Sequence, residues 1–168
     1  MKKLLLVIVL LVSAGATMAQ SKVAHVNSQK LLDTLPSRKD AIKKLQDFER
    51  NGVAELQEME KDLNDSYAKY EANRPSMSPV IIKIEEEKLM KKQQALQDRE
   101  QSLNAEMQAY SNELNGPILE RVQKAVQIVA DRRKLNYVID ESVTLYFAGG
   151  TDITDEVVIE LMRLESGQ

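Results

Sequence analysis

Few side chains in this sequence could carry out catalysis or bind a metal ion. The chain of 168 residues contains no Cys and a single His, His25. It therefore has no disulfide, no thiolate site and no multi-histidine zinc site, and a His-based triad would depend on His25 alone. Two acidic pairs could suggest hydrolase carboxylates: Asp140 with Glu141, and Asp152 with Asp155. We interpret the first pair as a strand end, Asp155 as helix-start chemistry and His25 as a packed core residue, and we expect no enzyme, no cofactor and no metal site.

The first nineteen residues have the pattern of a secretory signal peptide. Lys2 and Lys3 precede an unbroken apolar run over residues 4–12, and small residues stand before a cleavage point after Ala19. The alternative, a membrane anchor, requires a longer apolar run. No Cys follows the run, which excludes a lipoprotein anchor. Removal of the leader with its two lysines changes the net charge from −3 to −5, and this sign gives no support to nucleic-acid binding. We expect a soluble, exported protein whose mature chain is mildly acidic.

Two long segments, residues 37–74 and 80–115, contain no proline and are rich in strong helix formers. Apolar or small side chains recur every three or four residues in the first segment, and in the second they step by seven from Ile82 to Leu103. This spacing is typical of a coiled-coil seam. Helices of this length would each extend roughly 55 Å at 1.5 Å per residue.

The two segments meet at residues 74–79, where Pro75 and Pro79 interrupt the helical pattern. Ser78 can cap the second helix while Pro79 takes its first position. Because the segments have nearly equal lengths, we predict one long antiparallel helical hairpin over residues 37–115 with its tip at 74–79. The alternative is a single straight helix, against which the two prolines argue.

The remaining residues, 20–36 and 116–168, are predicted to form a small body into which the hairpin is inserted. A strand over 22–27 leads into a short helix that Asn27 or Ser28 caps. A helix follows Pro117, and β-branched and aromatic residues predict strands over 137–140 and 143–147. Thr154 is expected to cap a last helix. The fold class is therefore α+β, mostly α.

This body is too small for a core that is comfortably stable alone, and the chain has no disulfide to help. We therefore expect subunits to associate. The apolar residues that we expect at the subunit interface lie on the predicted strands: Val23, Val143, Leu145 and Phe147.

Several segments resemble the OmpH/Skp family of periplasmic chaperones: residues 22–29, 76–79, 117–126, 137–140 and 152–157. The resemblance extends over the whole mature chain. It implies a jellyfish-like homotrimer in which a small β-rich body holds three helical arms around a cavity. It further implies an ATP-independent holdase that binds unfolded outer-membrane β-barrel proteins and prevents their aggregation.

A surface that binds many unfolded sequences weakly requires adaptable apolar side chains, among which methionine is the most flexible. Our preferred candidates for client contact are Met77, Ile81 and Met90, followed by Met59, Tyr67 and Tyr70. The alternative is that apolar side chains at seam positions only join the two helices, which applies to Met59, Leu63, Tyr67, Leu89, Leu96 and Met107.

Charge distinguishes this tip from the strongly basic arms of the best-known family members. Residues 61–92 contain seven Lys or Arg and six Asp or Glu. These charges indicate a solvated face with pairs such as Glu87 with Lys91, and do not favour contact with lipid or lipopolysaccharide. Two other functions remain open: an envelope spacer or adaptor whose hairpin binds a folded partner, and a membrane-surface protein.

Overall fold

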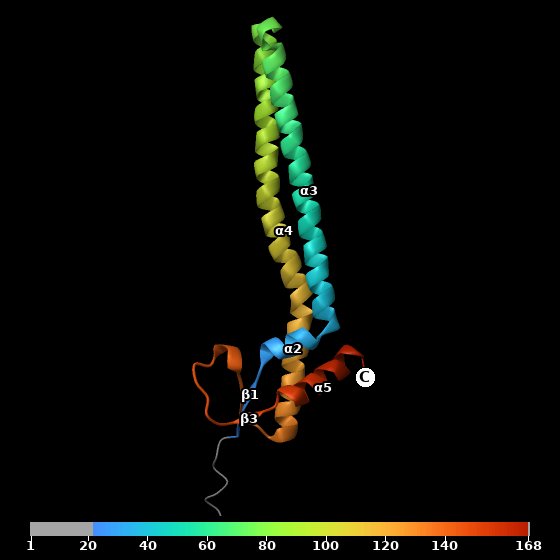
Figure 1. Ribbon diagram of the computed structural model, residues 1–168, viewed down its shortest axis with the longest axis vertical. Helices are drawn as coiled ribbons and strands as arrows, with labels where there is room; N and C mark the ends of the chain where they lie inside the picture. The colour runs from blue at the N-terminus through green and yellow to red at the C-terminus, as the bar shows by residue number, and fades with distance from the viewer. Residues whose placement is uncertain (1–21, 168) are drawn as a thin grey trace, which may run out of the picture. The chain divides into compact units, whose positions relative to one another are not determined.

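The computed structural model describes residues 22–167, so the predicted signal peptide lies outside the described residues. The elements in chain order are β1 (Val23–Val26), α2 (Ser28–Thr34), α3 (Pro36–Asn73), the 3₁₀-helix η2 (Arg74–Ser76), α4 (Pro79–Arg133), β2 (Tyr137–Asp140), the 3₁₀-helix η3 (Glu141–Val143), β3 (Thr151–Asp152) and α5 (Thr154–Glu165) (Figure 1). The predicted α+β class with mostly helix is confirmed. Internal contacts divide the chain into two compact units. We name residues 36–118 the hairpin, and residues 22–35 together with 119–167 the body. The predicted domain bounds, with a body over 20–36 and 116–168 and a hairpin over 37–115, stay a prediction.

The hairpin consists of α3 and the first part of α4, which run antiparallel. Pro75 lies in η2, Pro79 is the first residue of α4, and the Ser78 hydroxyl accepts a hydrogen bond from the Ile81 N–H at 3.4 Å. Polar contacts between the helices descend along α3 as they ascend along α4: Tyr70 with Glu86, Asp62 with Lys92, and Glu55 with Arg99. This order excludes the single straight helix and confirms the predicted hairpin.

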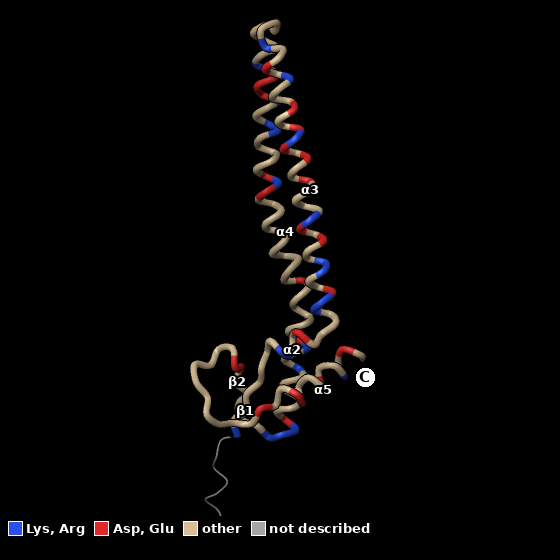
Figure 2. Tube along the Cα trace, in the orientation of Figure 1, with Lys and Arg blue, Asp and Glu red and all other residues tan. Residues whose placement is uncertain are grey.

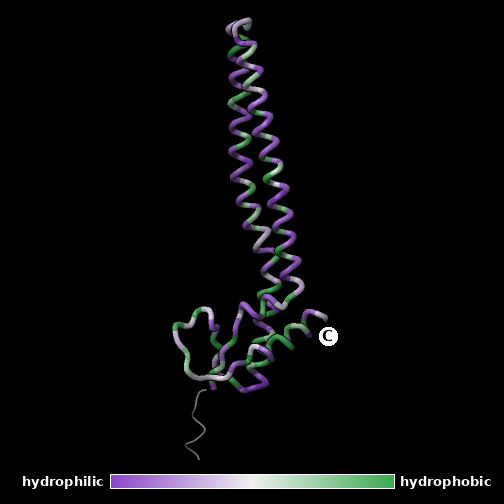
Figure 3. The backbone as a smooth tube through the Cα atoms, viewed as in Figure 1, coloured by the Kyte–Doolittle hydropathy of each residue, from purple (hydrophilic) through white to green (hydrophobic). Residues whose placement is uncertain are grey.

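Apolar contact between the two helices is thin. Hydrophobic positions recur along both helices with hydrophilic residues between them (Figure 3), and the deeply buried side chains include Tyr70, Leu89 and Leu103. Leu103 occupies the space beside Gly52, where an added Cβ would lie 2.4 Å from its Cδ1 atom. The glycine therefore permits close approach of the helices at this level.

Helix α4 differs from the prediction at Pro117, which was expected to precede a separate helix. The helix continues without interruption from Pro79 to Arg133. A proline inside a helix removes one N–H donor and costs about 3 kcal/mol. Buried Ile118, Ala125 and Val129 follow it along α4, and burial of these apolar side chains offsets that cost.

The body contains a three-stranded parallel sheet of order β2-β1-β3. Strand β1 is central: Val23 is opposite Tyr137 on β2, and His25 is opposite Asp152 on β3. The largest fully buried side chains of the body come from α2 and the residue after it, from α4, and from α5 and the residue before it: Leu31, Leu35, Val129, Ile153, Val157 and Leu161. A small apolar core thus fixes the positions of β1 and of the two segments paired with it.

The predicted strand over residues 143–147 is wrong. Residues 141–143 form η3, and the chain from Thr144 to Gly150 belongs to no strand. A β-rich composition produces a strand only where an adjacent edge offers backbone partners. Leu145 is instead fully exposed in this segment and Tyr146 is 82% exposed.

The predicted cap of the last helix by Thr154 is also wrong. The Asp152 carboxylate accepts hydrogen bonds from the Thr154 N–H at 2.8 Å and from its hydroxyl at 2.6 Å. The Thr154 hydroxyl oxygen accepts the Asn27 N–H at 3.0 Å. By contrast, the predicted Asn27 cap of α2 is confirmed, because its side-chain oxygen accepts the Lys30 N–H at 2.9 Å.

Candidate functional site

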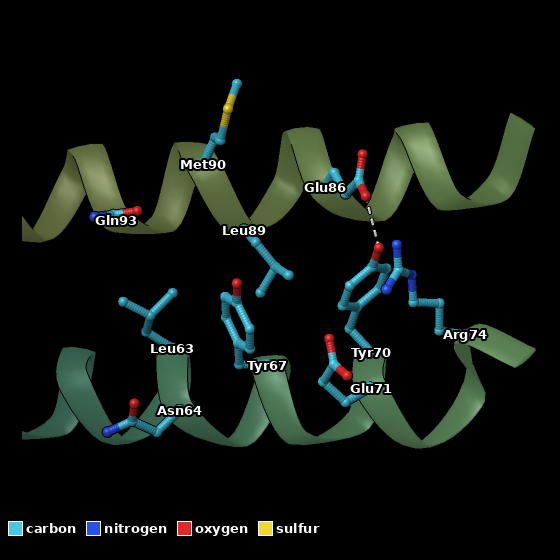
Figure 4. Close-up of a pocket in the computed structure, with 10 residues that line it drawn as sticks. All are labelled: Leu63, Asn64, Tyr67, Tyr70, Glu71, Arg74, Glu86, Leu89, Met90 and Gln93. Carbon is cyan, nitrogen blue, oxygen red and sulfur yellow. Dashed lines mark hydrogen bonds between the residues drawn. The ribbon is translucent and has the colours of Figure 1, made fainter. Parts of the chain in front are cut away.

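A groove of about 680 Å³ lies on the hairpin near its turn. Ten residues line it: Leu63, Asn64, Tyr67, Tyr70, Glu71 and Arg74 from α3 and η2, and Glu86, Leu89, Met90 and Gln93 from α4 (Figure 4). Leu63, Tyr67 and Leu89 point into the space between the helices, whereas Met90 points away from α3. The groove therefore combines an apolar floor with a flexible thioether side chain at its margin.

The two predicted tyrosines take different places in this groove. Tyr70 is only 6% exposed, and its hydroxyl donates a hydrogen bond to Glu86 at 2.7 Å. That hydrogen bond, with burial second, raises the pKa of Tyr70. Tyr67 is 54% exposed and meets the Tyr70 ring edge-on, with 6.4 Å between centroids. Tyr70 thus supports the groove, while Tyr67 presents a ring to solvent.

Exposure separates the other candidate residues. Met90 is 67% exposed and Ile81 is also exposed, whereas Met59 and Met77 are half-buried. Val80 and Ile84, which were not predicted from the sequence, are both exposed on the first turns of α4. The apolar residues at 80–82 and 84 are the signal that could have found them, because consecutive helical residues cannot all face one partner helix.

Charged side chains of both signs alternate along the hairpin (Figure 2). Lys88 pairs with Glu85 at 2.6 Å and Lys92 with Asp62 at 2.5 Å. The predicted pair of Glu87 with Lys91 is not among the ion pairs of the described residues. Farther along α4, Arg99 bridges Glu55 and Glu106. Hydrogen bonds from Ser102 and then Arg99 lower the pKa of Glu106. The surface beside the groove is thus well solvated and of mixed charge.

The body presents its own apolar surface. Val143 is 78% exposed, Leu145 is fully exposed, and Phe147 is exposed, whereas Val23 is half-buried in β1. Residues 142–151 contain no charged side chain, and this uncharged loop follows β2 in Figure 2. An apolar surface of this kind is typical of a region that another chain covers. Whether these four residues form a subunit interface stays a prediction.

The acidic residues of the body act as hydrogen-bond acceptors that hold its backbone. Burial raises the pKa of Asp140, but hydrogen bonds from Ser28 and Ser142 outweigh it and lower the pKa overall. Hydrogen bonds from Thr154 lower the pKa of Asp152. Carboxylates of this kind stay ionised and do not serve as general acids near neutral pH. Asp155 pairs with Lys30 at 2.7 Å.

His25 is half-buried and has a polar partner that the sequence did not reveal. Its Nδ1 atom lies 2.7 Å from a Glu141 carboxylate oxygen, and the Asn27 side-chain amide donates to the other oxygen at 2.9 Å. Possible metal-ligating atoms of His25, Glu141 and Asp152 lie within 4.8 Å of one another. The hydrogen bonds on Glu141 and Asp152 account for this arrangement, and we assign it no metal.

Among the described residues, no helix is both long enough and apolar enough to cross a membrane.

This chain is similar to known proteins in sequence and to a solved structure in fold. Chaperone protein Skp of Photorhabdus laumondii is 31% identical over 94% of this chain and 98% of its own length. Chaperone protein Skp of Escherichia coli is 28% identical over the same shares. A crystal structure of an OmpH-like protein from Caulobacter crescentus matches with a TM-score of 0.73 at 20% identity, covering 85% of each chain. The family described as outer membrane protein (OmpH-like) matches residues 22–161, and this chain belongs to that family.

Proposed function

We propose that this protein is an ATP-independent holdase chaperone that binds unfolded outer-membrane β-barrel proteins and prevents their aggregation. The observation that carries the proposal is the hairpin groove, where exposed Tyr67 and Met90 stand on helices of mixed charge. The relatives whose printed name is chaperone protein Skp, matched over nearly their whole length, support it.

The chemistry of the groove suits an unfolded barrel strand. Such a strand alternates apolar and polar side chains and would otherwise pair with other chains in water. Flexible methionine and an exposed tyrosine ring can pack against many different side chains, each contact being weak. Nearby charged side chains such as Lys88 and Glu85 are paired with each other. Charged residues keep the surface soluble, and because the two signs balance, the surface does not select clients by a strong net charge.

The proposal includes export to the periplasm after cleavage at Ala19 and assembly into a homotrimer through the body. A body of about 50 to 70 residues is marginal by itself, and exposed Val143 and Leu145 would be covered by association. Three hairpins held on one platform would present several weak grooves to the same client, which raises the overall affinity.

An aggregation assay tests the holdase proposal. An unfolded barrel protein diluted from urea should scatter little light with the wild-type chain, and more with the variant Tyr67→Ser/Met90→Ser. The matched control is Gln57→Ser/Gln101→Ser, which changes two exposed polar residues on the same two helices and should protect like the wild type. Equal protection by both variants would refute the groove as the client site, and no protection by the wild type would refute the holdase.

A further inference from the structure

One side chain, His25, contacts the start, the middle and the end of the segment 141–152. Its Nδ1 atom lies 2.7 Å from the Glu141 carboxylate at the start. Its ring packs on Phe147 in the middle, with 4.8 Å between centroids and a 35° tilt. At the end of the segment, the Asp152 carboxylate lies within 4.8 Å of a His25 nitrogen.

Carboxylates are the main charged groups near the His25 ring. Two carboxylates, Glu141 and Asp152, lie near the ring, and the Lys30 ammonium interacts with both of them at longer range. The ammonium is already paired with Asp155 at 2.7 Å. An imidazolium ion would thus attract the carboxylates at both ends of the segment and gain a cation–π contact with Phe147.

We propose that His25 is a pH-sensitive latch whose protonation tightens the segment 141–152 on strand β1. The Asn27 amide donates a hydrogen bond to the second Glu141 oxygen at 2.9 Å whatever the charge of His25. The Glu141 carboxylate therefore keeps its position beside His25 when His25 becomes protonated. Histidine ordinarily changes its charge between pH 5 and 8. Because an imidazolium ion attracts the Glu141 carboxylate at 2.7 Å more strongly than a neutral ring does, the latch is strongest at the acidic end of this range and weakens as the pH rises through it.

The latch regulates the apolar surface of the body. Val143 and Leu145 are strongly exposed, and both lie between Glu141 and Asp152 in the chain. Tightening the segment fixes these side chains and lowers the entropy that subunit association must remove. This consequence rests on the proposed function, in which the same residues form the subunit interface, whereas the latch itself does not.

Hydrogen exchange of residues 141–152 at pH 5.5 and pH 8.0 tests the latch, after correction for the intrinsic pH dependence of exchange. His25 is the single histidine of the chain, and carboxylates titrate below this range. Protection of the wild-type segment should be about two- to fivefold greater at pH 5.5, the range that a partly exposed ion pair supplies. His25→Gln cannot be charged and should show no such change. The same pH response in both proteins, or none in the wild type, would overturn the proposal.

A second variant keeps the test decisive if His25→Gln does not fold. Glu141→Gln preserves the size of the side chain but removes the charge that faces His25, and it should reduce the pH response. Asp131→Asn removes an exposed carboxylate elsewhere in the body and should leave the response unchanged. An undiminished response in Glu141→Gln would overturn the latch.

Light scattering at the same two pH values separates the latch from the proposed interface. If the protein forms oligomers but the hydrogen-exchange protection of residues 141–152 does not change with pH, the latch is refuted and the proposed interface is not. A single-chain mass at both pH values, with protection that depends on His25, would support the latch and refute the interface.

Discussion

Asp152 shows how one exposed carboxylate organises the body around it. It accepts the N–H and the hydroxyl of Thr154 at the start of α5, and Thr154 in turn accepts the N–H of Asn27 at the start of α2. The side chain of Asp152 therefore connects the ends of two helices through one intermediate residue. These hydrogen bonds depend on the backbone conformation of single residues, which the sequence alone does not reveal. For this reason the prediction of Thr154 as the cap was wrong.

Asp152→Ala should lower the free energy of unfolding at pH 7 by about 1 kcal/mol, the usual value of a helix-capping side chain. The pKa of Asp152 is lower in the folded protein, because hydrogen bonds from Thr154 stabilise its ionised form. Its contribution is thus present above the unfolded pKa of about 3.9 and is lost as the pH falls through the folded value. Urea titrations of both proteins at pH 7 and pH 3 measure the difference, which should shrink at pH 3.

The control for this prediction is Asp131→Ala, which removes an exposed carboxylate elsewhere in the body. It should change stability little at either pH. A loss in Asp152→Ala that is as large at pH 3 as at pH 7 would contradict the role of the ionised carboxylate.

The candidate site was only partly predictable at the residue scale. Spacing by threes and fours correctly identifies the face of α3 that carries Tyr67 and Tyr70, but it cannot tell which ring is exposed. That difference arises because the Tyr70 hydroxyl reaches Glu86 on the other helix. The pairing of His25 with Glu141 was equally out of reach, since 116 residues separate them in sequence.

At the scale of the elements, the close approach of α3 and α4 at Gly52 has a measurable consequence. Alanine favours a helix over glycine by about 1 kcal/mol, but a Cβ at residue 52 would overlap Leu103. Overpacking costs about 1–3 kcal/mol. Gly52→Ala should therefore lower the free energy of unfolding by about 1 kcal/mol net, as measured by urea denaturation.

Gly116→Ala is the matched control for this change. Gly116 also lies inside a helix, α4, and nothing would lie within 4 Å of its added Cβ. This variant should gain about 1 kcal/mol from helix propensity. An equal gain in stability at both glycines would show that Leu103 moves aside without cost.

Elements defined by local sequence were predicted well, and those that depend on distant partners were not. The helices on both sides of the turn follow from Pro75, Pro79 and the composition around them, which are local signals. The end of a helix at Pro117 was expected on the same grounds, but continued packing along α4 outweighs the lost hydrogen bond. Residues 143–147 have strand-like composition, yet they lack a strand partner within the described chain.

At the scale of the whole molecule, the exposed apolar residues of the body predict association. Light scattering should give a mass about three times that of one chain. Leu145→Asp places a charge where the proposed interface would exclude water, so it should shift the protein toward single chains. Ile159→Asp, a change of the same kind at another exposed body residue, is the control and should leave the mass unchanged. A trimer that tolerates Leu145→Asp would contradict the predicted interface.

The most direct test of the central claim is photo-crosslinking from the hairpin groove to a client. A photoreactive side chain at Met90 should form adducts with an unfolded outer-membrane barrel protein diluted from urea. The same side chain at Gln101, an exposed position farther along α4, should form few. The barrel protein folded beforehand in detergent should form none at either position. Equal adducts at both positions, or adducts with the folded barrel, would contradict a groove that binds unfolded chains.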